Sequence, residues 1–399
     1  MAFTKFKFIL TKLGIIASLL VLTGAFVLLW RSFFSSGYGT YSGQISFYLL
    51  TFPVALLILG GAAFIILLLL IWKKSALFLK MIWAVICISF FGIALLSGVQ
   101  NQYYADRIGV ETALMGNYTF SFSGTDTYSD LEEDVVYKTA VDEDLLLDVW
   151  DTKVNDENRP VIVNIHGGGW VGGDKSDVSS WSKWFNSQGY VVFNVEYSQN
   201  GSDMWQKQIS DTHAALNWIV EHADEYQIDE NRINVIGSSA GGHLALLTGY
   251  TELNENSLVT REMDSDSAVE INSIINLYGP SDVLQLYDEN NSKEFIQPLL
   301  EQLMDGQPKT EEIKHRYQQM SPVQYVNETS APTISFVGLK DKVVPEEQIE
   351  RLHEKLDENN IDNQAYYFPF SDHSYDTNWE SIATQTTRQK IEAFLNQYN

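Results

Sequence analysis

The sequence predicts an α/β fold, in which a mostly parallel sheet carries helices on both faces and is preceded by three transmembrane helices. Two observations predict it. The first 100 residues contain seven Lys or Arg and no Asp or Glu, and long apolar runs fill them. After residue 134, short β-branched apolar runs alternate with longer amphipathic segments. Strands that are apolar throughout and separated by helices are typical of a parallel sheet covered on both faces.

Residues 1–100 form the predicted membrane region. Three apolar runs stand there, at about 13–30, 45–72 and 77–99, and each is close to the ~20 residues that cross a bilayer core. A secretory signal peptide would account for the first run only, because soluble chain would follow its cleavage site. Since two more runs follow, we expect three transmembrane helices and an integral, multi-pass membrane protein.

Positive charges indicate the orientation of these spans. Six lysines lie before the first run or between the second and the third: Lys5, Lys7, Lys12, Lys73, Lys74 and Lys80. The other two flanks hold only Arg31 and Arg107. Because cytoplasmic flanks carry the excess of Lys and Arg, the amino terminus is expected in the cytoplasm. The chain after residue 99 is then expected outside the cell membrane.

The outer part of the chain is strongly acidic. Of the 26 Lys and Arg residues, seven lie in the first 100, so 19 remain beside 51 Asp and Glu, a formal charge of −32. Such a surface repels polyanions and offers no basic stripe, so nucleic acid is not an expected partner. The one cysteine, Cys87, lies in the third predicted span, and the outer domain is therefore expected to have no disulfide.

Residues 101–133 are predicted to be a linker or stalk, since they are polar and rich in Gly, Ser, Thr and Tyr. Residues 134–399 are predicted to be one domain. Its expected strands lie at 135–140, 145–150, 160–168, 190–198, 233–239, 271–279, 333–339 and 364–370, with helices at 203–226 and 346–359. The segment 281–330, polar and partly helical in pattern, is expected to be an insertion that forms a lid.

The stretch "INVIGSSAGGH" contains a candidate nucleophile. Gly237, Ser239 and Gly241 match G-x-S-x-G between a predicted strand and a predicted helix. A serine at the centre of such a turn is held in strained backbone with its hydroxyl exposed above the sheet, and only small neighbours permit the turn. Ser238 lacks this frame, because glycines would have to stand at 236 and 240, so Ser239 is the candidate.

A second motif, "HGGGW" at residues 166–170, follows a predicted strand directly. Attack on an ester carbonyl builds an oxyanion, and backbone amides of residues without side chains approach that charge closely. The alternative is a turn that needs glycine only for its backbone geometry. A nucleotide-binding loop is not indicated, since neither G-x-G-x-x-G nor a following Lys-Ser or Lys-Thr pair is present.

"HGGGW" and "GSSAGG" together resemble motifs of the α/β-hydrolase superfamily, specifically those of the hormone-sensitive-lipase and feruloyl-esterase-like carboxylesterases. The resemblance covers about residues 134–399 and implies an α/β-hydrolase fold with a catalytic triad in the order nucleophile, acid, histidine. It implies that Asp341 in "GLKDKVVP" is the acid and that His373 in "FSDHSY" is the histidine. The implied oxyanion hole consists of Gly167, Gly168 and the backbone amide of Ala240.

The chemistry of this trio is general. His373 would take the proton of Ser239, and Asp341 would hold the imidazole in the right tautomer and stabilise its charged form. Asp282 in "YGPSDV" also ends a predicted strand and stays open as an alternative acid. Asp372 is expected to be a solvent-exposed loop residue. His166 and His243 are expected to be structural, His166 by orienting the glycine loop and His243 by packing.

These features predict a membrane-anchored serine carboxylesterase that works through an acyl-enzyme on small-molecule or acylated substrates. No cofactor is expected, and no metal either, because no histidine pair or carboxylate cluster has metal-ligand spacing. One alternative is a serine peptidase of the prolyl-oligopeptidase type, which commonly carries a propeller domain that this chain lacks. Another is a membrane protein that uses a hydrolase fold to bind a ligand without catalysis.

Overall fold

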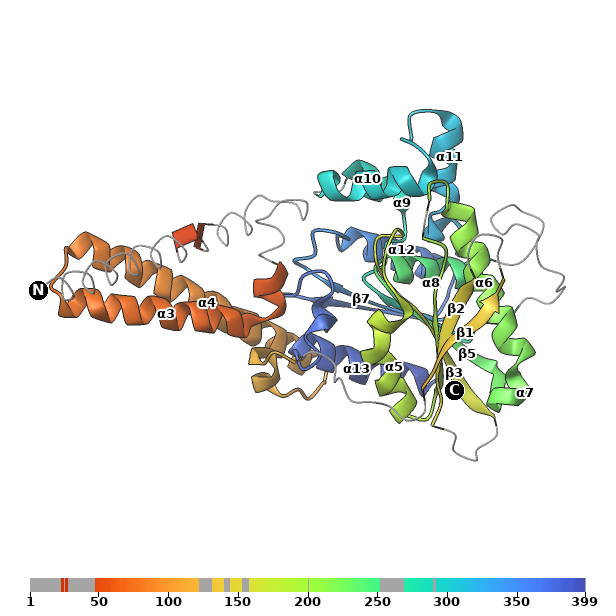
Figure 1. Ribbon diagram of the computed structural model, residues 1–399, viewed down its shortest axis with the longest axis horizontal. Helices are drawn as coiled ribbons and strands as arrows, with labels where there is room; N and C mark the ends of the chain where they lie inside the picture. Colours follow the sequence, from red (N-terminus) through yellow and green to blue (C-terminus); the bar gives the residue numbers. More distant parts are fainter. Residues whose placement is uncertain are drawn as a thin grey trace, which may run out of the picture.

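An eight-stranded sheet forms the centre of the described chain, in the order β1-β2-β4-β3-β5-β6-β7-β8 (Figure 1). The computed structural model describes residues 23–24, 26–27, 47–121, 131–139, 144–152, 158–199, 201–251, 269–289 and 292–398. The strands are β1 (Leu131–Lys138), β2 (Leu145–Trp150), β3 (Arg159–Ile165), β4 (Val191–Val195), β5 (Ile228–Ser238), β6 (Ser273–Leu277), β7 (Thr333–Gly338) and β8 (Asn363–Phe368). Each predicted strand is thus confirmed, with shifts of a few residues at the ends.

The sheet is parallel except at one edge. β2 pairs antiparallel with both β1 and β4, and every pairing from β4 to β8 is parallel. Parallel neighbours need a crossover connection, which explains why helices alternate with the strands. These helices are α5 (Ser179–Ser187), α6 (Trp205–Glu221), α7 (Ala223–Tyr226), α8 (Ala240–Tyr250), α12 (Glu347–Glu358) and α13 (Ile382–Leu395).

Both faces of the sheet are buried. Val161, Val163 and Ile165 of β3 belong to one apolar cluster together with residues of α6 and α8. Ile162, between them in sequence, belongs to a second cluster with residues of α5 and α13. Because successive side chains of a strand point to opposite faces, two-sided burial requires the continuous apolar runs seen in the sequence.

The segment between β6 and β7 contains three helices, α9 (Val283–Glu289), α10 (Lys293–Met304) and α11 (Glu311–Gln319). They stand beside the carboxyl-terminal ends of the strands, apart from the helices that cover the two faces (Figure 1). This is the segment predicted to be an insertion, and its helices contribute side chains to the cavity described below.

Two helices of the described part are long and apolar enough to cross a membrane, α3 (Pro53–Trp72) and α4 (Leu77–Arg107). They pack against each other and project from one side of the α/β unit (Figure 1). The first predicted span, 13–30, lies outside the described residues except for 23–24 and 26–27, which are helical.

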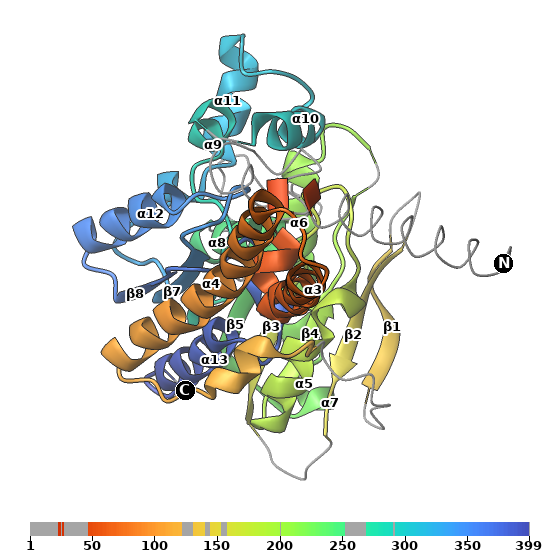
Figure 2. The ribbon, with the colours of Figure 1, turned by 90° about the vertical axis from the view of Figure 1, so that its left-hand side faces the viewer.

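Helix α4 continues past residue 99, where its predicted span ends, and stops at Arg107. No proline or glycine interrupts residues 100–107, so the helix persists although its composition becomes polar. A short 3₁₀ helix, η1 (Leu114–Tyr118), follows. The segment predicted as linker therefore begins as helix, and it packs with η1 against α13 (Figure 2).

Candidate active site

Ser239 lies in the tight turn between β5 and α8. Its backbone has φ 54° and ψ −120°, a strained conformation for a residue with a side chain. Glycine is required on both sides, because a Cβ at Gly237 would overlap the carbonyl oxygen of Gly241, and a Cβ at Gly241 would overlap that of Ile165. The turn therefore packs tightly against the end of β3, and it directs the Ser239 side chain into a cavity.

The structure brings Ser239, His373 and Asp341 together from the ends of three parallel strands. The Ser239 hydroxyl lies 2.9 Å from Nε2 of His373. Nδ1 of the same imidazole lies 2.7 Å from an oxygen of Asp341. In this arrangement the carboxylate accepts the Nδ1 proton and leaves Nε2 free to accept a proton from the serine, which is the geometry of a nucleophile activated by a general base.

Asp341 is held rigidly in its turn after β7. Its second carboxylate oxygen accepts hydrogen bonds from the backbone amides of Val343 and Val344, each at 2.8 Å. Asp282, the alternative acid, lies elsewhere. Its carboxylate accepts a hydrogen bond from the amide of Gln285 at 3.0 Å and pairs with Arg351 at 3.4 Å. It therefore caps the start of α9.

The sequence-based expectation that Asp372 is solvent-exposed is wrong. Only 2% of this residue is exposed, and its carboxylate accepts a hydrogen bond from the backbone amide of His373 at 2.8 Å. Burial, together with the negative charge of Asp341, raises the pKa of Asp372 to about 7. The turn that follows β8 folds inward over the site, so its polar side chains are buried despite the loop-like sequence.

The pKa of His373 is set by opposing effects. Burial of the ring disfavours the imidazolium, but the carboxylates of Asp341, Asp372 and Asp376 favour it, and the net result is a raised pKa. The nearby carboxylates therefore favour the protonated ring more strongly than burial disfavours it.

The glycine-rich loop after β3 lies against the turn of Ser239. Gly167, Gly168 and Gly169 all line the same cavity as Ser239, and a Cβ at Gly167 would lie only 3.4 Å from that of Ser239. Gly168 has φ +128°, a conformation that is strained for any other residue. Ala240 is the first residue of α8, where a backbone N–H has no partner within the helix. The glycine-rich loop and the first residue of α8 therefore both adjoin Ser239.

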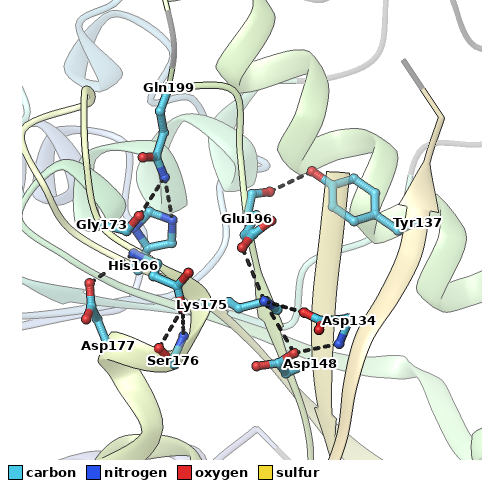
Figure 3. Close-up of polar contacts among 11 residues, drawn as sticks. Asp134, Tyr137, Asp148, His166, Gly173, Lys175, Ser176, Asp177, Glu196 and Gln199 are labelled. Atoms are coloured by element: carbon cyan, nitrogen blue, oxygen red, sulfur yellow. Dashed lines mark hydrogen bonds and ion pairs between the residues drawn. The ribbon is translucent and has the colours of Figure 1, made fainter. Parts of the chain in front are cut away.

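His166 holds this loop in shape, in line with its predicted structural role. Its Nδ1 lies 2.7 Å from the carbonyl oxygen of Gly167. Its Nε2 lies 3.2 Å from the side-chain amide nitrogen of Gln199 (Figure 3). The same amide group donates to the carbonyl oxygen of Gly173 at 3.0 Å. The ring also stacks on Tyr197. Burial lowers the pKa of His166, so the neutral ring connects both ends of the loop.

The loop ends at a buried lysine that was not singled out in the sequence. Nζ of Lys175 lies 2.8 Å from a carboxylate oxygen of Asp134, 3.3 Å from one of Glu196 and 3.7 Å from one of Asp148 (Figure 3). These acids come from β1, β2 and the end of β4. Lys175 therefore attaches the glycine-rich loop to the antiparallel edge of the sheet.

The cavity above Ser239 has a volume of about 600 Å³. One part of its wall is apolar and comes from α9, α10 and the turn after β7: Leu286, Phe295, Ile296, Leu299, Val343 and Val344. Another part is polar: Asp177, Ser180, Ser374, Asp376 and Thr377. A ligand with an apolar part and a polar part fits such a lining.

Three residues at the site were missed in the sequence. The ring of Tyr278 lies 4.8 Å from that of His373, and its hydroxyl donates to Asp376 at 2.5 Å. The indole of Trp181 donates to the other oxygen of Asp376 at 2.8 Å. In the sequence, the only signal at Tyr278 is its position before a glycine at the end of a predicted strand. No local sequence pattern links Tyr278 to Trp181 or Asp376.

His243 is buried within α8, as its predicted packing role requires. Its Nδ1 accepts from the indole of Trp170 at 3.1 Å, and its Nε2 lies 2.6 Å from the carbonyl oxygen of Met320. Burial lowers its pKa to about 4, so the ring is neutral. Among the described residues, no group of three or more His, Cys, Asp and Glu could hold a metal ion.

Comparisons with known proteins show similarity to esterases and related hydrolases. A family model described as BD-FAE matches residues 147–356, and the model of the dienelactone hydrolase family matches residues 315–398. The chain is 27% identical to esterase LipC of Mycobacterium tuberculosis, over 63% of this chain and 62% of that protein. It is 28% identical to the probable carboxylic ester hydrolase LipM of the same organism, over 62% and 57%. The chain thus spans about three fifths of the length of these relatives.

Solved esterase structures share the fold. Esterase Est2 of the planctomycete Thermogutta terrifontis, in its propionate-bound form, is 25% identical, with a TM-score of 0.55 over 67% of this chain and 94% of that chain. The native form of the same esterase gives a TM-score of 0.56 at 23% identity, over 67% and 92%. The part of this chain that these structures match is about as long as its α/β unit.

Proposed function

The chain belongs to the BD-FAE family and has the α/β-hydrolase fold, and we propose that it is a membrane-anchored carboxylic ester hydrolase that forms an acyl-enzyme on Ser239. The observation that carries this proposal is the hydrogen-bonded series Ser239, His373 and Asp341 at a cavity lined by the glycine-rich loop.

In the proposed reaction, the Ser239 hydroxyl attacks the ester carbonyl while Nε2 of His373 takes its proton. The oxyanion of the tetrahedral intermediate is stabilised by the backbone amides of Gly167, Gly168 and Ala240. The imidazolium then donates that proton to the departing alkoxide, and an alcohol leaves. Water attacks the acyl-enzyme with His373 again as base, which releases the acid and restores Ser239.

Hydrolysis of aryl esters by the purified full chain tests this function. Esters with acyl groups of graded length should be hydrolysed at different rates, because the apolar wall formed by α9 and α10 can contact only a limited length of the acyl chain. Peptide amides serve as the comparison. Faster cleavage of amides than of esters would support a peptidase instead, and binding of esters without turnover would support a non-catalytic role.

The membrane part of the proposal rests on α3 and α4 and on the apolar residues 13–30. We infer three membrane spans, a cytoplasmic amino terminus and a catalytic domain outside the cell membrane. A protease-sensitive tag after residue 399 should then be removed by protease added to intact cells. A tag that is cleaved only after lysis would reverse the orientation.

Gly168→Ala is expected to lower kcat/KM by about 10²- to 10³-fold, the usual effect of losing an oxyanion donor. A Cβ at residue 168 would overlap the carbonyl oxygen of Gly172, and φ is +128° there, so the loop must move away from Ser239. Steady-state kinetics on a short aryl ester measures the effect. Gly172→Ala is the matched control, because its Cβ would lie 3.7 Å from the carbonyl oxygen of Gly168. Equal losses in both variants would contradict the proposed oxyanion hole.

The activity is expected to fall as pH decreases through the pKa of His373, because the proposed base must be neutral. Since that pKa is raised, the acidic limb of kcat/KM should have an apparent pKa above the ordinary histidine value of about 6.5. The pKa of Asp372 is itself raised to about 7, so its carboxylate favours the imidazolium only where it is ionised. Asp372→Asn removes that charge, keeps an oxygen for the His373 amide and should move the limb to lower pH. A shift to higher pH, or no shift, would contradict this account.

A further inference from the structure

Helix α4 connects the proposed membrane anchor to the turn that carries His373. The helix is one uninterrupted element from Leu77 to Arg107. Its apolar part packs on α3, and its polar last turns lie against the α/β unit near α13 and β8 (Figure 2). Side chains of these last turns therefore contact the outer edge of the sheet.

Asn101 makes the contact nearest to the site. Only 4% of this residue is exposed. Its side-chain oxygen accepts a hydrogen bond from the backbone amide of Phe370 at 3.1 Å, and its amide nitrogen donates to the hydroxyl of Ser371 at 3.4 Å. Both partners lie within three residues of His373. A buried carboxamide that bonds a backbone amide in this way fixes the path of the chain.

One turn further along α4, Tyr104 covers the edge of the sheet. Its hydroxyl accepts a hydrogen bond from the backbone amide of Tyr367 at 3.0 Å, and its ring packs edge-on against Phe368 at 5.8 Å. Because β8 ends the strand order, its outward-facing amides have no neighbouring strand as a partner. Helix α4 supplies hydrogen-bond acceptors to the backbone amides of β8 and of the turn that follows it.

The turn is held from its inner side by the segment that bears the proposed acid. The carbonyl oxygen of Ser371 accepts a hydrogen bond from the amide of Lys340 at 2.9 Å, next to Asp341. Residues 370–371 are thus fixed between Asn101 on one side and the turn after β7 on the other. Both contacts lie within three residues of His373 or beside Asp341.

The chain beyond His373 also reaches the proposed membrane helices. The side-chain nitrogen of Asn378 donates to the backbone carbonyl of Thr51 at 3.0 Å, just before α3 begins. The segment from 370 to 378 therefore contacts α4 at one end and the residues just before α3 at the other.

We propose that Asn101 is a positioning residue for His373, through which the membrane helix α4 becomes part of the support of the active site. This rests on the proposed function, since it assumes that His373 is the base. Loss of the Asn101 contacts would let residues 370–373 shift relative to Ser239. Misplacing a catalytic group by 1 Å lowers the rate by about 10²-fold. The turn at residues 370–373 would keep its contact with Lys340, so it should shift by less and the rate should fall by less.

The test uses the full chain in detergent micelles or nanodiscs. Asn101→Ala is expected to lower kcat on a short aryl ester by about 10-fold with little change in KM, because the proton transfer and not the cavity is affected. Asn101→Asp keeps an oxygen for the Phe370 amide and should lie between Asn101→Ala and the wild type. Tyr104→Phe keeps the ring against Phe368 and should give a smaller loss of kcat, which tests the same support if Asn101→Ala does not fold.

Asn117→Ala is the matched control. Asn117 is equally buried at the junction, with 2% exposed, but its amide nitrogen bonds Ser97 of α4 at 3.4 Å and not the turn of His373. This variant should keep the wild-type kcat. Equal losses in Asn101→Ala and Asn117→Ala, an effect on KM alone, or a wild-type kcat in Asn101→Ala would overturn the proposal. A wild-type chain without esterase activity would instead contradict the proposed function.

Discussion

Ser239→Ala is expected to abolish ester hydrolysis, with a loss of kcat/KM on the order of 10⁴-fold or more. The proposed acyl-enzyme cannot form without the hydroxyl that lies 2.9 Å from Nε2 of His373. Binding should persist, since the cavity walls and the glycine-rich loop are unchanged. The measurement is the rate of product release from a short aryl ester, together with labelling of the protein by an organophosphonate that reacts with activated serines.

The neighbouring serine supplies the control. Ser238 ends β5 and lacks the positive φ that distinguishes Ser239 in the turn, so Ser238→Ala should retain most of the activity and the labelling. The two variants carry the same substitution at neighbouring positions, so effects on folding and stability should be similar in both. Undiminished hydrolysis by Ser239→Ala, or loss in Ser238→Ala alone, would contradict the assignment of the nucleophile.

Asp341→Asn is expected to lower kcat by a factor on the order of 10⁴, because a carboxamide fails to hold His373 in the tautomer that accepts the serine proton. The present carboxylate accepts the Nδ1 proton with one oxygen and two backbone amides with the other. An amide nitrogen in place of either oxygen cannot accept a hydrogen bond, so the contact with His373 or those with the two backbone amides are lost. Pre-steady-state kinetics should show slower acylation and slower deacylation, because His373 is the proposed base in both steps.

Asp282→Asn is the comparison that separates the two candidate acids. Asp282 bonds the amide of Gln285 and pairs with Arg351, far from any contact with His373 in the described structure. Its replacement should change thermal stability slightly and leave the pH profile of kcat unchanged. A loss in Asp282→Asn as large as that in Asp341→Asn would show that the capping role is not its main one.

Much of the fold could be predicted because its signals are local. Each strand is a short apolar run, and continuous burial on two faces leaves that run visible in the sequence. The turn of Ser239 is likewise local, since Gly237 and Gly241 are needed within two residues of it. Asp341 and His373 were implied by the resemblance to α/β-hydrolase carboxylesterases, and their positions after β7 and β8 bring them to one edge because parallel strands share the direction of their carboxyl ends.

The sequence by itself thus determined the class of fold, the strand positions and the candidate nucleophile. Only the tertiary structure decided that Asp372 is buried, that Asp282 caps α9 and that Asp376 joins Trp181 to Tyr278. Likewise, the polar composition after residue 99 indicated a linker, whereas Asn101 bonds Phe370, 269 positions along the chain. The reason is physical: propensity and periodicity act over a few residues, but burial and hydrogen-bond partners are set by segments distant in sequence, which meet only when the sheet forms.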